Sequence, residues 1–106
     1  MFARRVYLHL KPNSVAELTQ KLDKEIIPLL RKQKGFQDEI TFVSKGGKEA
    51  FGISLWDNAD NAEAYNRGTY PEVTKLLAAV VEGPAQVETF DVSNSTFHKL
   101  AAVVTA

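Results

Sequence analysis

The segment from Phe51 to Trp56 alternates large apolar side chains with smaller ones, and it ends in the single tryptophan of the chain. A period of two is typical of a β-strand, so we predict a strand over residues 49–56. Asp57 or Asn58 can then cap a helix, which places Trp56 at the start of that helix. The small side chains of the tryptophan-bearing face are Ala50, Gly52 and Ser54.

Helical spacing precedes and follows this strand. Residues 15–30 carry one apolar stripe, and Ser14 with Glu17 forms a predicted capping box at its start. Pro28 lies inside the stripe and predicts a kink near residues 23–24, because it removes one backbone hydrogen bond. Gly35 is expected to close this helix. The second helix is expected over residues 59–67, interrupted at Gly68 and resumed from Tyr70-Pro71 to the stripe Val73, Leu76, Leu77 and Val80.

Three further segments alternate like strands, namely residues 3–10, 36–44 and 85–92. The paired glycines of residues 45–48 predict a two-residue hairpin turn between the second and third strands. The resulting order indicates an α+β fold, a ferredoxin-like β-α-β-β-α-β sandwich whose four-stranded antiparallel sheet carries both helices on one face.

The other sheet face would expose an apolar surface too large for a monomer. We therefore predict a homodimer joined through these open faces. Residues 1–92 would form the single domain, and residues 93–106 a tail whose apolar end, residues 100–104, is available to cross to the partner subunit.

The composition argues against several classes of partner and of binding site. The 13 basic and 13 acidic side chains give a formal charge of zero, so no long-range field attracts nucleic acid or an acidic membrane. The chain has no cysteine, which excludes disulfides and thiolate metal sites. No apolar run approaches the roughly 18 residues of a membrane span. We expect a cytoplasmic protein that contacts neither nucleic acid nor membrane.

Three short strings carry a family resemblance: Pro28-Leu29-Leu30, Lys34-Gly35-Phe36 and Ser54-Leu55-Trp56. Together with the helix that follows, they resemble the antibiotic biosynthesis monooxygenase-like domains of the dimeric α+β barrel superfamily, over about residues 3–92. The resemblance implies a dimeric barrel, and its members include cofactor-free oxygenases of quinols and polyketide phenols. Their tryptophan maps onto Trp56. Gly52 stands where an asparagine would be expected, and no histidine lies between Trp56 and His98 to ligate haem.

Five residues are candidates for a site. His9 and Trp56 are the expected catalytic residues, with His9 as the group that titrates near neutral pH. Tyr7, Trp56, Tyr65 and Tyr70 are the expected substrate contacts. Each also has a structural interpretation: Trp56 as a core-edge residue, Tyr7 and His9 as interface polar groups, and the other tyrosines as helix packing.

The expected function is oxidation of a small phenol or quinol by molecular oxygen, by a cofactor-independent monooxygenase that needs no metal. The alternatives are a non-catalytic dimeric barrel that binds a small apolar metabolite, and a purely structural domain. The first two differ in whether a titrating group, His9 above all, faces the same cavity as Trp56. The carboxylates of Asp38, Glu39 and Glu49 are interpreted as solvated surface of the strand pair.

Overall fold

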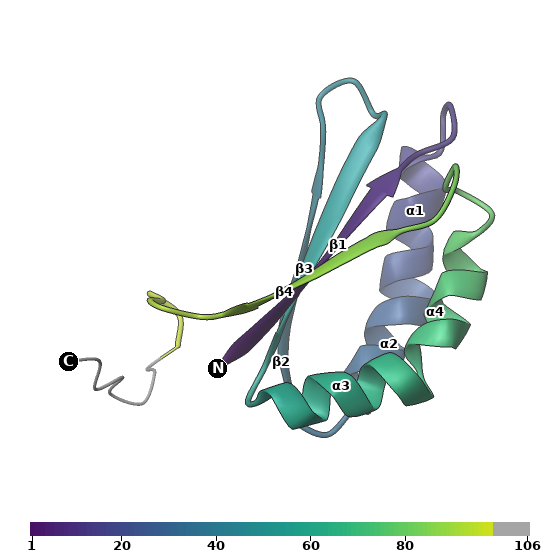
Figure 1. The fold of residues 1–106 in the computed structure, drawn as a ribbon. Helices are drawn as coiled ribbons and strands as arrows, with labels where there is room; N and C mark the ends of the chain where they lie inside the picture. Colours follow the sequence, from purple (N-terminus) through teal and green to yellow (C-terminus); the bar gives the residue numbers. More distant parts are fainter. Residues whose placement is uncertain (99–106) are drawn as a thin grey trace.

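The helices lie on one side of the sheet and leave its other side open (Figure 1). The computed structural model describes residues 1–98. Its strands are β1 (Phe2–His9), β2 (Phe36–Val43), β3 (Glu49–Trp56) and β4 (Gln86–Asp91). Its helices are α1 (Val15–Lys21), the π-helical η1 (Leu22–Ile26), α2 (Ile27–Arg31), α3 (Ala59–Gly68) and α4 (Tyr70–Leu77).

The sheet has four strands in the order β2-β3-β1-β4, and every neighbouring pair is antiparallel. This is the predicted ferredoxin-like α+β sandwich, and its strands start and end within a few residues of the predicted bounds. Phe2 and Val6 of β1 pair with Trp56 and Gly52 of β3. The register therefore places even-numbered residues of both strands on the helix side and odd-numbered residues on the open face.

The first helix is irregular where the sequence predicts a kink. The π-helical turn Leu22–Ile26 ends two residues before Pro28, which has no N–H to bond the carbonyl one turn earlier. The predicted capping box is wrong. The Ser14 hydroxyl forms no cap hydrogen bond and instead donates to the Pro12 carbonyl at 3.4 Å. Asn13 has a positive φ of 58°, and Ser14, with φ −105° and ψ 0°, lacks the extended backbone that is typical of an N-cap residue.

The second helix follows its prediction. The Asn58 side chain accepts a hydrogen bond from the Asn61 backbone N–H at 2.9 Å and caps α3. The helix is interrupted at Thr69, after Gly68, and Pro71 lies in the first turn of α4. The hairpin differs from its prediction: Ser44 and Glu49 are joined by a backbone hydrogen bond across a longer loop, in which Gly47 alone of the two glycines has a positive φ.

The core lies between the sheet and the helices. Trp56 and Val80 have no exposed surface, and Leu18 is 1% exposed. The Trp56 ring contacts Phe36 and Tyr65 at centroid distances of 5.6 and 5.0 Å. The strand that ends in the tryptophan thus anchors α3 to the sheet.

The open face carries apolar side chains on three strands. Ile40 and Phe42 of β2 and Phe90 of β4 are 41%, 46% and 47% exposed. Phe42 stacks on Phe51 of β3 at 4.9 Å. His98 contacts Asp38 on this face, while the apolar tail segment predicted to reach a partner lies outside the described residues. None of the helices within residues 1–98 has the length and apolar character needed to cross a membrane.

Candidate functional site

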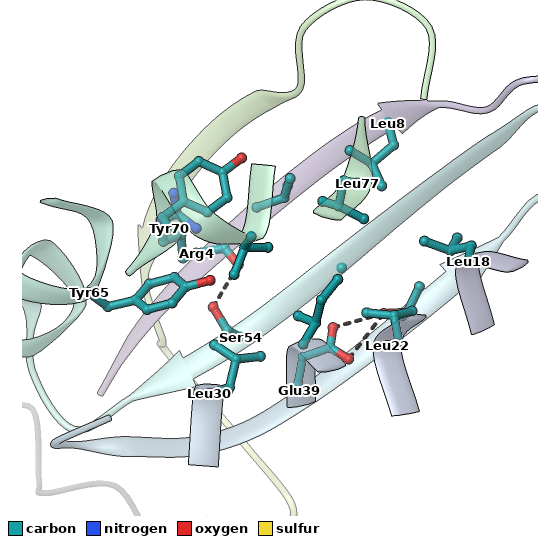
Figure 2. A pocket seen from close by; sticks show the side chains of 15 residues that line it. Arg4, Leu8, Leu18, Leu22, Leu30, Glu39, Ser54, Tyr65, Tyr70 and Leu77 are labelled. Carbon is teal, nitrogen blue, oxygen red and sulfur yellow. Dashed lines mark hydrogen bonds between the residues drawn. The ribbon is translucent and has the colours of Figure 1, made fainter. Parts of the chain in front are cut away.

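A cavity of about 60 Å³ lies between the sheet and the helices. Its apolar walls come from the first helix, from α4 and from β1 (Figure 2), and they consist of Leu18, Leu22, Ile26, Leu30, Val73, Leu77, Val6 and Leu8. Its polar lining consists of Arg4, Glu39, Thr41, Ser54, Tyr65 and Tyr70. An apolar cavity with a few convergent polar groups is the usual form of a small-molecule site.

The small face of β3 forms the floor of this cavity through Gly52 and Ser54. Space left by the missing side chain of Gly52 is taken by the carboxylate of Glu39, on the neighbouring strand. A Cβ atom at Gly52 would lie 2.9 Å from Glu39 Oε2. The small residues that the sequence places beside Trp56 therefore make room for a carboxylate as well as for a cavity.

Glu39 is half-buried and faces the cavity, so its interpretation as solvated surface is wrong. Its two carboxylate oxygens accept the Thr41 hydroxyl at 2.8 and 3.0 Å. Burial raises the pKa of Glu39 above its usual value, and the hydrogen bond from Thr41 opposes part of that rise. The alternation of β2 predicts that Glu39 and Thr41 share one face of the strand. Only the pairing register of β2 with β3 shows that this face is the one that meets the helices.

Arg4 is a second cavity residue that the sequence analysis missed. It is 3% exposed, and its Nη2 donates to Asn66 Oδ1 at 2.7 Å. The guanidinium carbon lies 4.0 Å from the centre of the Tyr70 ring and 5.3 Å from that of Tyr65. Arg4 lies two residues before Val6 and four before Leu8, so the alternation of the strand places all three side chains on the same, buried face. This spacing could have predicted that the Arg4 side chain points inward.

The two predicted substrate-contacting tyrosines of the helices both line the cavity. In Figure 2 the Tyr65 hydroxyl points toward Ser54 and the cavity interior. Burial raises the pKa of Tyr65 to about 12, with a smaller opposing effect from Arg4. Tyr70 is half-buried and begins α4, directly after the break between the two helices. The Tyr65 phenol is therefore a neutral hydrogen-bonding group near neutral pH.

Trp56 does not line the cavity, contrary to prediction. Its ring is fully buried because Tyr65 and Phe36 cover it, and its Nε1 donates to Ser54 Oγ at 2.9 Å. The Ser54 hydroxyl in turn lies 3.5 Å from the Arg4 carbonyl. Trp56 thus reaches the cavity only through Ser54 and Tyr65.

Tyr7 and His9 lie on the open sheet face, across β1 from the cavity. The Tyr7 hydroxyl donates to the Glu49 carboxylate, and this hydrogen bond raises the pKa of Tyr7. His9 is exposed, packs its ring edge on Tyr7 and borders a separate surface depression of about 490 Å³ formed with the neighbouring loops. His9 and Trp56 do not line one cavity, contrary to expectation. In the register of β1 and β3, even-numbered residues such as Trp56 lie on the helix side and odd-numbered residues such as His9 lie on the open face.

No protein-family model matches the sequence, and neither does any curated protein. Solved structures do match. A putative antibiotic biosynthesis monooxygenase from Bordetella bronchiseptica superposes with a TM-score of 0.74 and 16% identity, over 88% of this chain and 97% of that chain. The chain has the fold of antibiotic biosynthesis monooxygenases.

Two structures with assigned activities share this fold. SnoaB, a cofactor-independent oxygenase from Streptomyces nogalater, superposes with a TM-score of 0.72 and 12% identity, over 90% of this chain and 95% of that chain. A monooxygenase from the gene ActVA-Orf6 of Streptomyces coelicolor, in complex with nanaomycin D, gives a TM-score of 0.70 and 16% identity, over 92% of both chains. At these identities the likeness confirms the fold alone.

Within this monooxygenase fold, the buried carboxylate predicts a pH dependence of stability. The pKa of Glu39 is higher in the folded protein than its ordinary value of 4.5, so its contribution to stability is present in full below that ordinary value. It is lost as the pH rises through the folded pKa. Glu39→Gln should therefore raise the urea midpoint near neutral pH and leave it almost unchanged below pH ~4.

The matched control is Glu17→Gln, on the exposed side of α1, which should not raise the midpoint at either pH value, because an acidic residue in the first turn of a helix is favourable when charged. Circular dichroism during urea titration provides the measurement. A lower midpoint for Glu39→Gln near neutral pH would contradict the prediction, since it would mean that the ionised carboxylate stabilises the fold.

Proposed function

We propose that the protein is a cofactor-independent monooxygenase that oxidises a small phenol or quinol with molecular oxygen in the cavity between sheet and helices. Two proteins of this fold support the proposal: one is described as a cofactor-independent oxygenase, and the other holds nanaomycin D. The observation that carries the proposal is the buried guanidinium of Arg4 at an apolar cavity.

Arg4 lacks a carboxylate partner: no ion pair to Asp or Glu is formed by it among residues 1–98. Its neighbours are the neutral amide of Asn66 and the faces of two tyrosine rings. A buried cation without an anionic partner carries a desolvation penalty that an anionic ligand would relieve. A phenolate oxygen supplies that negative charge, while its ring suits the apolar walls and Tyr65 and Tyr70.

The reaction balances with O₂ as the single co-reactant. Loss of one hydroxyl proton gives a phenolate, whose electrons reduce O₂ so that a bond forms between oxygen and a hydrogen-bearing ring carbon ortho or para to that hydroxyl. The resulting peroxide anion takes up a proton and becomes a hydroperoxide. The hydroperoxide then loses water: its O–O bond breaks, the ring carbon gives up its hydrogen, and a quinone carbonyl remains. One oxygen atom enters the quinone and the other enters water. The phenol supplies all four electrons.

The cavity must widen to hold such a ring. Its volume of about 60 Å³ is less than half of the roughly 150 Å³ that holds benzene in an engineered protein cavity. Tyr70 is the side chain best placed to move, because it is half-buried and follows the helix break at Thr69. Outward movement of Tyr70 would open the cavity at its α4 end without disturbing the buried Trp56.

Oxygen uptake tests the proposal. With a panel of small phenols and quinols, and after exhaustive chelation of metals, the protein should consume oxygen. Arg4→Gln should lower kcat by about 10²–10³, since it removes the charge that stabilises the phenolate. The control is Arg31→Gln, an exposed position on α2, which should retain full activity. Uptake that is equally fast in Arg4→Gln would contradict the role of Arg4.

A non-catalytic module that binds a small apolar metabolite is the second candidate. Two features favour it. Gly52 lies at the position where the resembling oxygenases place an asparagine, and neither His9 nor Trp56 lines the cavity. Saturable binding of phenols without oxygen uptake across the whole panel would select this candidate. If the protein neither binds these phenols nor consumes oxygen, both proposed functions are wrong.

A further inference from the structure

Glu39 supplies the carboxylate of the central cavity, and its charge is not neutralised within residues 1–98. The ion pairs of that part of the chain do not include it, and its partner in the structure is the Thr41 hydroxyl. Each carboxylate oxygen has more than one acceptor site, so the Thr41 hydroxyl leaves capacity unused. The free capacity faces the cavity, where a ligand could donate to it (Figure 2).

Gly52 is what allows the carboxylate to lie there. An added Cβ would come within 2.9 Å of Glu39 Oε2 and 3.4 Å of Thr41 Oγ1. Gly52 does not have a positive φ, so its backbone conformation is one that any residue can adopt. Glycine is therefore needed at this position for its small size: a larger side chain would occupy the space into which Glu39 and Thr41 extend over β3.

We propose, building on the phenol oxidation proposed above, that Glu39, held by Thr41 across the gap at Gly52, accepts the proton of a ring hydroxyl in the central cavity. The ligand O–H bond breaks and a carboxylic O–H bond forms. The electron pair stays on the ligand oxygen as a phenolate. The ligand class is thus an aromatic ring that donates a hydroxyl proton, rather than any apolar molecule of that size.

The surroundings of Glu39 suit this role. Its charged and titratable neighbours around the cavity are Arg4 of β1, Tyr65 of α3 and Tyr70 of α4, while the first helix contributes only leucine and isoleucine side chains to the wall. Burial in this apolar setting raises the pKa of Glu39 and so brings its proton affinity closer to that of a phenol, near 10. Arg4 would stabilise the phenolate as it forms.

Calorimetric binding of phenol and toluene tests the inference without any catalysis, because the two molecules differ by a hydroxyl in place of a methyl group. Wild-type protein should prefer phenol by about tenfold or more, the worth of a hydrogen bond to a charged acceptor. The preference should fall on acidification as Glu39 becomes protonated. Glu39→Gln should reduce the preference and remove its pH dependence, whereas Glu17→Gln should behave as wild type.

Gly52→Ala tests the positioning. The added methyl group displaces the Glu39 carboxylate, the mobile end of a side chain, while the backbone is undisturbed. This variant should fold with a normal spectrum and still lose most of the preference for phenol. With an oxidisable quinol, Glu39→Gln should lower kcat by about 10²–10⁴ and abolish the acid limb of the pH profile.

The outcomes separate the two proposals. If phenol preference depends on Glu39 but no oxygen is consumed, Glu39 is the proton acceptor of a binding module and the oxygenase function is wrong. If oxygen is consumed but Glu39→Gln retains kcat within threefold, together with the acid limb, the oxygenase stands and the role of Glu39 is overturned. Equal binding of phenol and toluene by the wild-type protein also overturns it.

Discussion

Replacing Trp56 with alanine should lower the free energy of unfolding by about 3–5 kcal/mol, the largest effect that we expect from any single core substitution. The ring has no exposed surface and packs against Phe36 and Tyr65. Its removal leaves a cavity at the junction of β3 and α3, and it deprives Ser54 of a hydrogen-bond donor. Urea denaturation followed by circular dichroism measures the loss, since the substitution removes the tryptophan fluorescence.

Two further variants serve as comparisons for Trp56→Ala. Trp56→Phe keeps much of the ring packing and should lose less stability than the alanine variant. Phe97→Ala removes an aromatic side chain that is 66% exposed, and it should change stability by less than about 0.5 kcal/mol. A cost for Trp56→Ala that is no larger than for Phe97→Ala would contradict the description of Trp56 as a core residue.

The sequence predicts the architecture because local signals agree with one another. The alternation of β3, the cap at Asn58, the π-helical turn before Pro28 and the break after Gly68 each reflect short-range chemistry. Where the prediction failed locally, at the Ser14 cap, a positive φ at Asn13 redirected the chain. The capping-box pattern covers the four positions from Ser14 to Glu17, so it cannot detect a turn made at the residue before it.

The site is harder to predict than the fold, because it depends on which sheet face meets the helices. His9 and Tyr7 were attractive for their chemistry, yet their parity on β1 sends them to the open face. Glu39 was interpreted as a surface charge and Arg4 was given no role, yet Arg4 shares a face with Val6, and Glu39 shares a face with Gly52. A charged residue on the buried side of a strand breaks the usual pattern, and such breaks are expected where a site is built.

The second large effect concerns assembly: we propose that the protein is a homodimer joined through its open sheet faces, and that Phe90→Glu dissociates it. Ile40 and Phe42 on one edge strand and Phe90 on the opposite edge strand are about half exposed in the single chain, all on the sheet face that the helices leave open. A two-fold interface would bury the new carboxylate twice, without a partner. The dissociation constant should rise at least about a hundredfold, since an unpaired buried charge costs several kcal/mol.

Sedimentation equilibrium at micromolar concentration decides between these states. Wild-type protein should sediment as a dimer and Phe90→Glu as a folded monomer, because the side chain is already 47% exposed in the single chain. Ala16→Glu places the same charge on the exposed side of α1, and this control should remain dimeric. A monomeric wild type would refute the interface. A dimer that survives Phe90→Glu would show that the subunits meet elsewhere, which would leave the open face, with Tyr7 and His9 on it, free to serve another partner.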